Sequence, residues 1–199
     1  EFWVDPASPY FKPVFGDDSK EFVLFCGAGW RSALATKALQ DQLATKDLPF
    51  LAEHVGVDFD WAVLKGRSNY VCLQRLREMS AGEQGQLELE TMAVQTKVEI
   101  KRLAEWSGST ATGDMAELDW TPSDNAWRAV SVGSDECPGA DRCPLGDPCF
   151  AEQARRRAAA ADVIVVNTHL YGLNVASGGA ILPEHDVVAR ERGERTQHL

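Results

Sequence analysis

Four cysteines have the residue type and the spacing to hold a metal centre. Cys137, Cys143 and Cys149 follow one another with five residues between successive members, and Cys72 lies far upstream. Thiolates are soft ligands, so a group of them favours zinc or an iron–sulphur cluster. Proline and glycine between the three close cysteines predict an irregular loop, which offers little core in which to bury a free thiol. The fold would have to bring Cys72 back to this loop.

The residues alone leave the kind of metal open. Structural zinc sites usually take their ligands as close pairs with two to four residues between them, whereas gaps of five residues with proline nearby favour a larger iron–sulphur cluster. A third interpretation is that the cysteines are small buried hydrophobic residues, which is the ordinary role of a lone cysteine such as Cys72. We favour the cluster, with zinc as the runner-up.

Composition narrows the class of protein. The chain has 199 residues, of which 44% are hydrophobic, and no apolar run has the length of a membrane span. No secretory signal opens the chain, and five cysteines are an odd number, so a cytoplasmic protein with reduced thiols is expected. The chain begins at Glu1 rather than at methionine, so an upstream portion could be missing.

The total charge and the local charges of the chain give opposite indications for nucleic-acid binding. A net charge of −10 argues against a protein that coats nucleic acid generally. Basic residues nevertheless flank the cysteines, with Lys65, Arg67 and Arg75 near Cys72, and Arg155 and Arg156 after Cys149. Together these side chains predict a local contact with phosphate, although any single one would be an ordinary surface cation.

The elements that must position these residues form a mixed α/β pattern. Short apolar runs predict strands, and runs of helix-forming residues predict helices. The expected strands are 22–25, 61–64, 163–166 and a weaker one at 182–188. The expected helices are 32–43, 48–55, one that contains Cys72, 87–106 and 150–160. A helical, cysteine-bearing insertion would therefore interrupt an α/β framework.

Two stretches carry a family resemblance. The run WAVLKGRSNYVCLQRL at 61–76 is similar to the entry into the iron–sulphur domain of XPD/DinG-like superfamily 2 DNA helicases. The loop of three cysteines with CFAEQARRRAAAADVIVVNTHL at 149–170 resembles the return from that domain into the first motor domain, and TKALQDQL at 36–43 resembles motif Ia. The resemblance covers about residues 36–188.

The resemblance implies an architecture and a role for each segment. Residues 36–64 and 151–188 would be incomplete parts of a RecA-like motor domain, residues 65–150 a mainly helical cluster domain, and residues 189–199 an unmatched tail. Cys72, Cys137, Cys143 and Cys149 would be the ligands of a [4Fe-4S] cluster. Thr36 of motif Ia would contact the backbone of single-stranded DNA, and the partner would be single-stranded or forked DNA.

The chain lacks the motifs by which this family hydrolyses ATP. A phosphate loop needs lysine and Ser/Thr after its second glycine, but Asp114 and Met115 follow the glycine-spaced run Gly108–Gly113. The acidic DEAH box that holds magnesium is also missing from the sequence. We therefore expect no site for ATP and Mg²⁺, and no ATPase activity, in this chain taken alone.

The fifth cysteine indicates a different family. Residues 1–42, including the loop from Cys26 to Arg31, resemble part of a rhodanese domain, with a strand, a loop and a helix in that order. The resemblance implies that Cys26 carries a persulphide and that Arg31 belongs to the anion-binding loop, which makes a rhodanese-type sulphurtransferase the alternative function. Both resemblances share residues 35–42, so a junction is expected there, from recombination or from sequence assembly.

Overall fold

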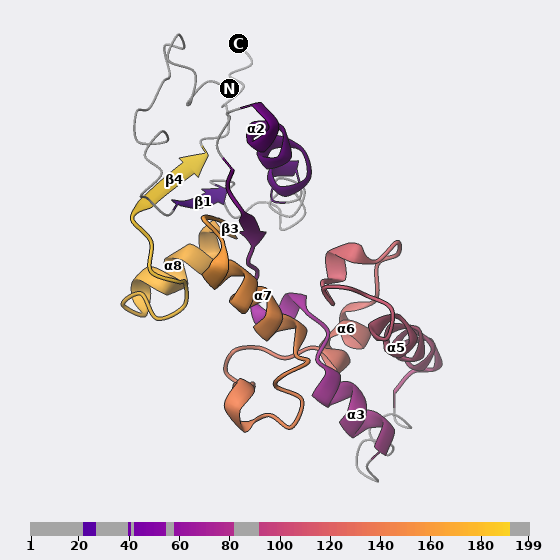
Figure 1. Cartoon of the computed structure of the whole chain (residues 1–199). Coiled ribbons are helices and arrows are strands. Elements are labelled where there is room, and N and C mark those ends of the chain that lie inside the picture. Colours follow the sequence, from indigo (N-terminus) through magenta and orange to yellow (C-terminus); the bar gives the residue numbers. More distant parts are fainter. Residues whose placement is uncertain (1–21, 27–39, 41, 55–57, 82–91, 192–199) are drawn as a thin grey trace, which may run out of the picture. The chain divides into compact units, whose positions relative to one another are not determined.

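The computed structural model describes residues 22–26, 40, 42–54, 58–81 and 92–191, and only the backbone of 22–26, 80–81 and 189–191 (Figure 1). The chain divides into two compact units, which are treated separately below. The sheet unit comprises Glu1–Lys65 with Arg157–Leu199, and the cysteine unit comprises Gly66–Arg156. The sequence predicts a cluster domain at 65–150, and its identification as a cluster domain stays a prediction.

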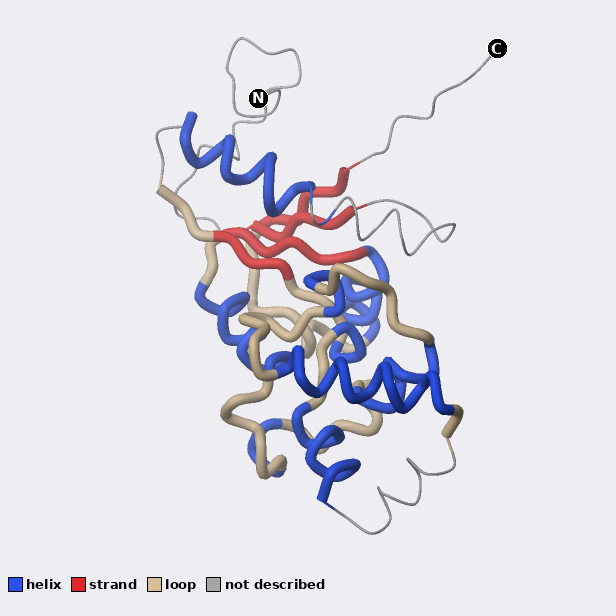
Figure 2. Tube along the Cα trace, turned by 90° about the vertical axis from the view of Figure 1, so that its right-hand side faces the viewer, coloured by secondary structure: helices blue, strands red, loops and turns tan. Residues whose placement is uncertain are grey.

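The sheet unit is built on four parallel strands, red in Figure 2. The strands are β1 (Phe22–Cys26), β2 (Trp61–Val63), β3 (Val163–Asn167) and β4 (Val187–Glu191), in the order β2-β3-β1-β4. Strand β1 pairs with β3 on one side and with β4 on the other. Val165 and Val166 of β3 are fully buried, as expected for a parallel strand covered on both faces.

Helix α2 (Leu48–His54) follows a π-helical turn, η2 (Leu43–Asp47), and supplies part of the core of the sheet unit. Leu48 packs with Val163 and Val165, and five partly buried hydrophobic residues surround them: Leu43, Leu51, Phe59, Trp61 and Val63. The strands expected at 22–25, 61–64 and 163–166 and the helix expected at 48–55 are confirmed within about one residue. Most of the helix expected at 32–43 lies outside the described residues.

The chain segment after the cysteines agrees with prediction up to β3 and then departs from it. Helix α7 (Phe150–Ala160) has the expected bounds, whereas α8 (Thr168–Ala176) was not predicted. The strand expected at 182–188 is wrong for most of its length, because β4 begins only at Val187. Asn174 explains the difference, since its buried Oδ1 accepts hydrogen bonds from the amides of Ile181 (3.0 Å) and Leu182 (2.9 Å), which a strand would need for pairing.

The cysteine unit is helical, with no named strand among its described residues. Its helices are α3 (Leu73–Ala81), α5 (Val94–Ser107) and α6 (Asp124–Val130), together with the 3₁₀ turns η3 (Arg67–Asn69), η4 (Met115–Glu117) and η5 (Ala140–Arg142). Helix α5 packs against α6, and the buried Ile100, Leu103, Ala126 and Val130 lie on these two helices. Of the helix expected at 87–106, residues 87–91 lie outside the described part of the chain, Met92 and Ala93 are not helical, and α5 covers the rest.

The expected fold class is confirmed at the level of a mixed α/β protein with a small parallel sheet. Among the described residues, none of the helices has the length and apolar character needed to cross a bilayer.

Candidate metal centre

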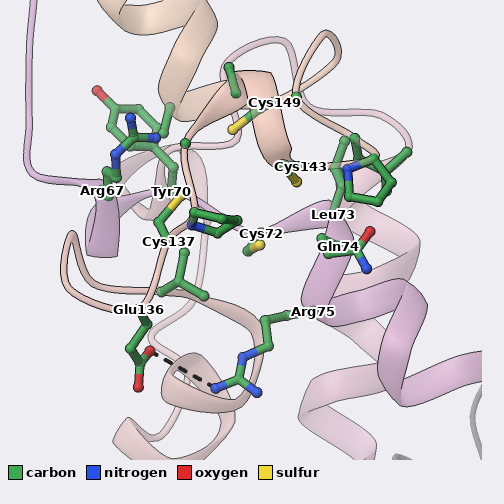
Figure 3. Close-up of a pocket in the computed structure, with 18 of the residues that line it drawn as sticks. Arg67, Tyr70, Cys72, Leu73, Gln74, Arg75, Glu136, Cys137, Cys143 and Cys149 are labelled. Carbon is green, nitrogen blue, oxygen red and sulfur yellow. Dashed lines mark ion pairs between the residues drawn. The ribbon is translucent and has the colours of Figure 1, made fainter.

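A hollow of about 450 Å³ in the cysteine unit is lined by Cys72, Cys137, Cys143 and Cys149. In Figure 3 the four sulphur atoms lie around the same opening. They come from two segments: the residue before α3, and the loop around η5 that ends at the residue before α7. The fold therefore returns Cys72 to the loop of the other three, as the sequence requires of a shared site.

Backbone hydrogen bonds fix Cys72 against distant parts of the chain. Its amide donates to the carbonyl of Val130 (2.7 Å), and the amide of Val71 donates to the carbonyl of Gly113 (2.9 Å). Its carbonyl accepts from the amide of Leu76 (3.1 Å), so Cys72 immediately precedes α3. The helix expected around Cys72 is confirmed within one residue, since Cys72 directly precedes α3.

Turns place the other three cysteines. The amides of Cys137 and Cys143 donate to the carbonyls of Gly133 (3.2 Å) and Gly139 (3.1 Å), and the amide of Cys149 donates to the carbonyl of Gly146 (3.3 Å). Gly146 must be glycine here, because a Cβ atom would collide with the carbonyl of Ala140. The loop thus owes its tight path to particular small residues rather than to a core.

The kind of metal that the four cysteines would hold stays a prediction. Among the described residues, no three His, Cys, Asp or Glu side chains lie close enough together to hold one metal ion. Four thiolates on one zinc would have to lie about 3.8 Å from one another, given Zn–S bonds of about 2.3 Å. An iron–sulphur cluster tolerates wider spacing, since each cysteine binds a different iron.

Burial raises the pKa of the Cys72 thiol. Hydrogen bonds from the backbone of Arg75 and Gln74 oppose this rise, and the charges of Cys149 and Cys143 add to it. A cation bound nearby would oppose this rise and favour the thiolate of Cys72.

The predicted cations have unequal access to solvent. Lys65 is only 8% exposed, which leaves it little surface for a phosphate. Arg67 is also largely buried and pairs with Glu152 (3.2 Å), and burial lowers the pKa of Arg155, with the charge of Arg67 adding to the effect. Arg75 and Arg156 are exposed and form longer pairs, with Glu136 (3.9 Å, dashed in Figure 3) and Asp147 (3.8 Å).

The acidic partners of these arginines were not predicted. Glu136 and Glu152 are each one to three residues from a cysteine of the loop, and that proximity was the signal available in the sequence. Glu152 lies in the first turn of α7, facing Arg67 from a segment far away in the chain, which sequence spacing does not reveal.

The glycine-spaced run Gly108–Gly113 bonds to itself rather than offering its amides to a phosphate. The amide of Gly113 donates to Thr110 Oγ1 (2.9 Å), and the hydroxyls of Thr110 and Thr112 both donate to the carboxylate of Glu117. Gly113 has a positive φ of 65°, and a Cβ there would collide with the ring of Phe150. Its negative neighbour and internal bonds make this run a structural loop.

The remaining predicted residues are only partly described. Cys26 is the last residue of β1, but its side chain lies outside the described part of the chain. Arg31 of the rhodanese-like loop and Thr36 of the motif Ia resemblance also lie outside it. The sulphurtransferase alternative therefore stays a prediction.

No family model matches the chain, but several known proteins are similar to it. The ATP-dependent DNA helicase YoaA of Escherichia coli K12 is 40% identical over 158 residues, which are 77% of this chain and 24% of that protein. The ATP-dependent helicase DinG of Mycobacterium tuberculosis H37Ra is 38% identical over 162 residues, 76% of this chain and 24% of that protein. The 3'-5' exonuclease DinG of Bacillus subtilis is 31% identical over 149 residues, 73% of this chain and 15% of that protein.

The chain thus spans about a quarter or less of the length of these relatives. The similarity supports a fragment of a DinG-like helicase, since it extends over roughly three quarters of the chain.

Proposed function

We propose, from this similarity to DinG- and YoaA-type DNA helicases, that the chain is the segment of such a helicase that holds a [4Fe-4S] cluster and binds single-stranded or forked DNA. One observation carries the proposal: Cys72 and the distant loop that holds the other three cysteines line one hollow. Such a gathering of thiols is costly unless a soft metal centre binds them. We place the protein in the cytoplasm, where such thiols stay reduced.

The donor set fits the cluster. Four cysteines supply the number of thiolates that a [4Fe-4S] cluster requires, and the turns of the loop fix three of them independently of a core. When bound, the cluster would supply a cross-link between the start of α3 and the loop before α7. The chain's own contribution is to hold these two segments together and to expose arginines beside them.

The exposed arginines support the DNA part of the proposal. Arg75 and Arg156 lie on the helices that adjoin the cysteines, α3 and α7. Their pairs with Glu136 and Asp147 are long and solvent-exposed, so each contributes little and can be exchanged for a phosphate. Because Gly108–Gly113 is a structural loop without the lysine of a phosphate loop, we propose that the whole protein hydrolyses ATP with other segments.

An iron and acid-labile sulphide assay on anaerobically purified protein tests the cluster. We expect about four irons and four sulphides per chain, with a brown colour that Cys143→Ser abolishes or strongly reduces. Cys26→Ser is the matched control, because Cys26 is not among the four cysteines of the hollow, and it should leave the iron content unchanged. Stoichiometric zinc without iron, or equal iron in wild type and Cys143→Ser, would contradict the proposal.

A further inference from the structure

A second hollow, of about 480 Å³, lies at the C-terminal end of α5 in the cysteine unit. It shares no lining residue with the hollow of the four cysteines. Two indole rings line it, those of Trp106 and Trp120, and the charged side chains around them are Arg102, Glu105, Glu117 and Asp119. The hollow therefore combines two aromatic faces with three carboxylates, a lining that is both aromatic and acidic.

One side of this hollow already holds a guanidinium group. The Arg102 guanidinium carbon lies 4.4 Å from the centre of the Trp120 ring, and the same group pairs with Asp119 at 3.2 Å. An arginine that stacks on an indole and pairs with a carboxylate satisfies both its planar face and its N–H donors. The internal pair therefore shows which ligand chemistry the hollow accommodates.

The other side of the hollow has the same kind of groups without a cation. Trp106 is half-buried, and the exposed carboxylate of Glu105 has no hydrogen-bond or ion-pair partner among the described residues. Glu117 is held in place by the hydroxyls of Thr110 and Thr112, so its negative charge stays beside the hollow. With Asp119 neutralised by Arg102, two carboxylates remain uncompensated.

We propose that this hollow binds an arginine side chain from a basic segment of a partner protein. The guanidinium group lies against the face of Trp106 and pairs with Glu105, next to the internal set of Arg102, Trp120 and Asp119. Charge complementarity selects this occupant, because the uncompensated carboxylates attract a cation and repel the phosphates of a nucleic acid.

Calorimetric titration of the full chain with a short peptide tests the proposal. The peptide is N-acetylated and C-amidated Gly-Arg-Gly-Arg-Gly, and its citrulline counterpart keeps the shape but not the charge. We expect Trp106→Leu and Glu105→Gln each to weaken binding of the arginine peptide by about fivefold or more. Glu184→Gln is the control, an exposed carboxylate outside the hollow whose loss changes the net charge equally.

Arg102→Ala gives a result of opposite sign. Removing the internal guanidinium frees Trp120 and Asp119, so the arginine peptide should bind about threefold more tightly. A general attraction between a basic peptide and an acidic protein would change little in any one variant.

Three outcomes overturn the proposal. Equal affinity for the arginine and citrulline peptides would show that binding does not depend on the positive charge of the peptide. Equal weakening by Glu105→Gln and Glu184→Gln would show that binding does not depend on a carboxylate in this hollow. Binding of oligothymidylate that Trp106→Leu abolishes while peptide binding persists assigns the hollow to single-stranded DNA instead. If Trp106→Leu does not fold, Glu105→Gln and Arg102→Ala still decide, since both side chains are exposed.

Discussion

At the scale of single residues, the arginines near the cysteines fall into two classes that the sequence does not separate. Arg67 and Arg155 are partly buried and lie near the charge of Glu152, which pairs with Arg67, whereas Arg75 and Arg156 are exposed beside weak acidic partners. The first pair serves the packing of the cysteine unit, and the second is available to a ligand. The two classes predict different phenotypes.

Glu152→Gln should destabilise the protein. The Glu152 carboxylate accepts a hydrogen bond from Arg67 (3.2 Å), and its charge favours the charged form of Arg155, so its loss leaves two arginines that repel each other in a partly buried site. Losing a hydrogen bond to a charged group costs about 1–3 kcal/mol, which urea unfolding measures. The exposed pair of Arg156 and Asp147 is the control, and Asp147→Asn should cost no more than about 0.5 kcal/mol. Equal losses in the two variants would show that Glu152 has no special role.

The double variant Arg75→Gln/Arg156→Gln should weaken binding of single-stranded DNA without changing stability. The logarithm of the affinity falls with the logarithm of the salt concentration, and each lost phosphate contact makes this slope less steep by about 0.7. The slope of the double variant should therefore be less steep than that of the wild type by about 1.4. Fluorescence anisotropy of a labelled oligothymidylate across a salt series measures this change. Lys101→Gln on α5 is the control and should leave the slope as it is. A slope unchanged in the double variant would mean that the strand runs elsewhere.

At the scale of elements, the sequence predicts those segments whose pattern has one physical meaning. Strand β3 is a run of β-branched residues too short for a helix, and α7 is rich in alanine and arginine, so both have the expected bounds. The four cysteines were likewise apparent from type and spacing. What could not be predicted depends on contacts between distant residues: Asn174 bonding the amides of Ile181 and Leu182, and Glu152 reaching Arg67.

Helix α6 shows a local signal that was overlooked. Ser123 is its N-cap and accepts a hydrogen bond from the amide of Ala126 (3.4 Å). The Glu99 carboxylate on α5 then accepts from both the amide and the hydroxyl of Ser123, at 2.9 and 2.6 Å. The start of one helix is therefore fixed by a side chain of its neighbour, which the capping residue alone does not reveal.

The bond between these helices predicts a pH dependence. The hydrogen bonds from Ser123 lower the pKa of Glu99 below its ordinary value of 4.5. A lowered folded-state pKa gives stability that is present above the unfolded value and is lost as the pH falls through the folded value. Wild type should therefore have a higher urea midpoint than Glu99→Gln at pH 7, and the difference should shrink towards zero below about pH 4.

Comparing two proteins at each pH cancels the acid effects that they share. Ser123→Ala should lower stability by about 1 kcal/mol at pH 7 through loss of the cap, and should also remove most of the effect of Glu99→Gln. A difference between wild type and Glu99→Gln that stays constant from pH 7 to well below about pH 4 would show that the negative charge of Glu99 does not stabilise this contact.

At the scale of the whole molecule, the parallel sheet of one unit and the cysteine loop of the other depend on different forces. The parallel sheet buries β3 and the apolar residues around Leu48, whereas the loop of the cysteine unit follows turns with little core. The sheet also joins segments that were assigned to different resemblances. Strand β1 lies in the stretch whose rhodanese resemblance stays a prediction, and it pairs with β3 and β4 as a short apolar strand of a parallel sheet does.

Removing the proposed cluster should therefore loosen one unit and spare the other. A cross-link between Cys72 and the loop before α7 restricts a long stretch of chain. When the cross-link is lost, the backbone hydrogen bonds that Cys72 and Val71 donate, to Val130 and Gly113, should open more often. Hydrogen exchange of these amides should accelerate by about tenfold or more after anaerobic chelation of iron. The amides of β3 are the internal control and should keep their protection, because the sheet takes no residue from the hollow. Equal acceleration in both units would mean that the chain unfolds as one cooperative body, and no change in either would mean that the cysteines do not bind a cross-linking centre.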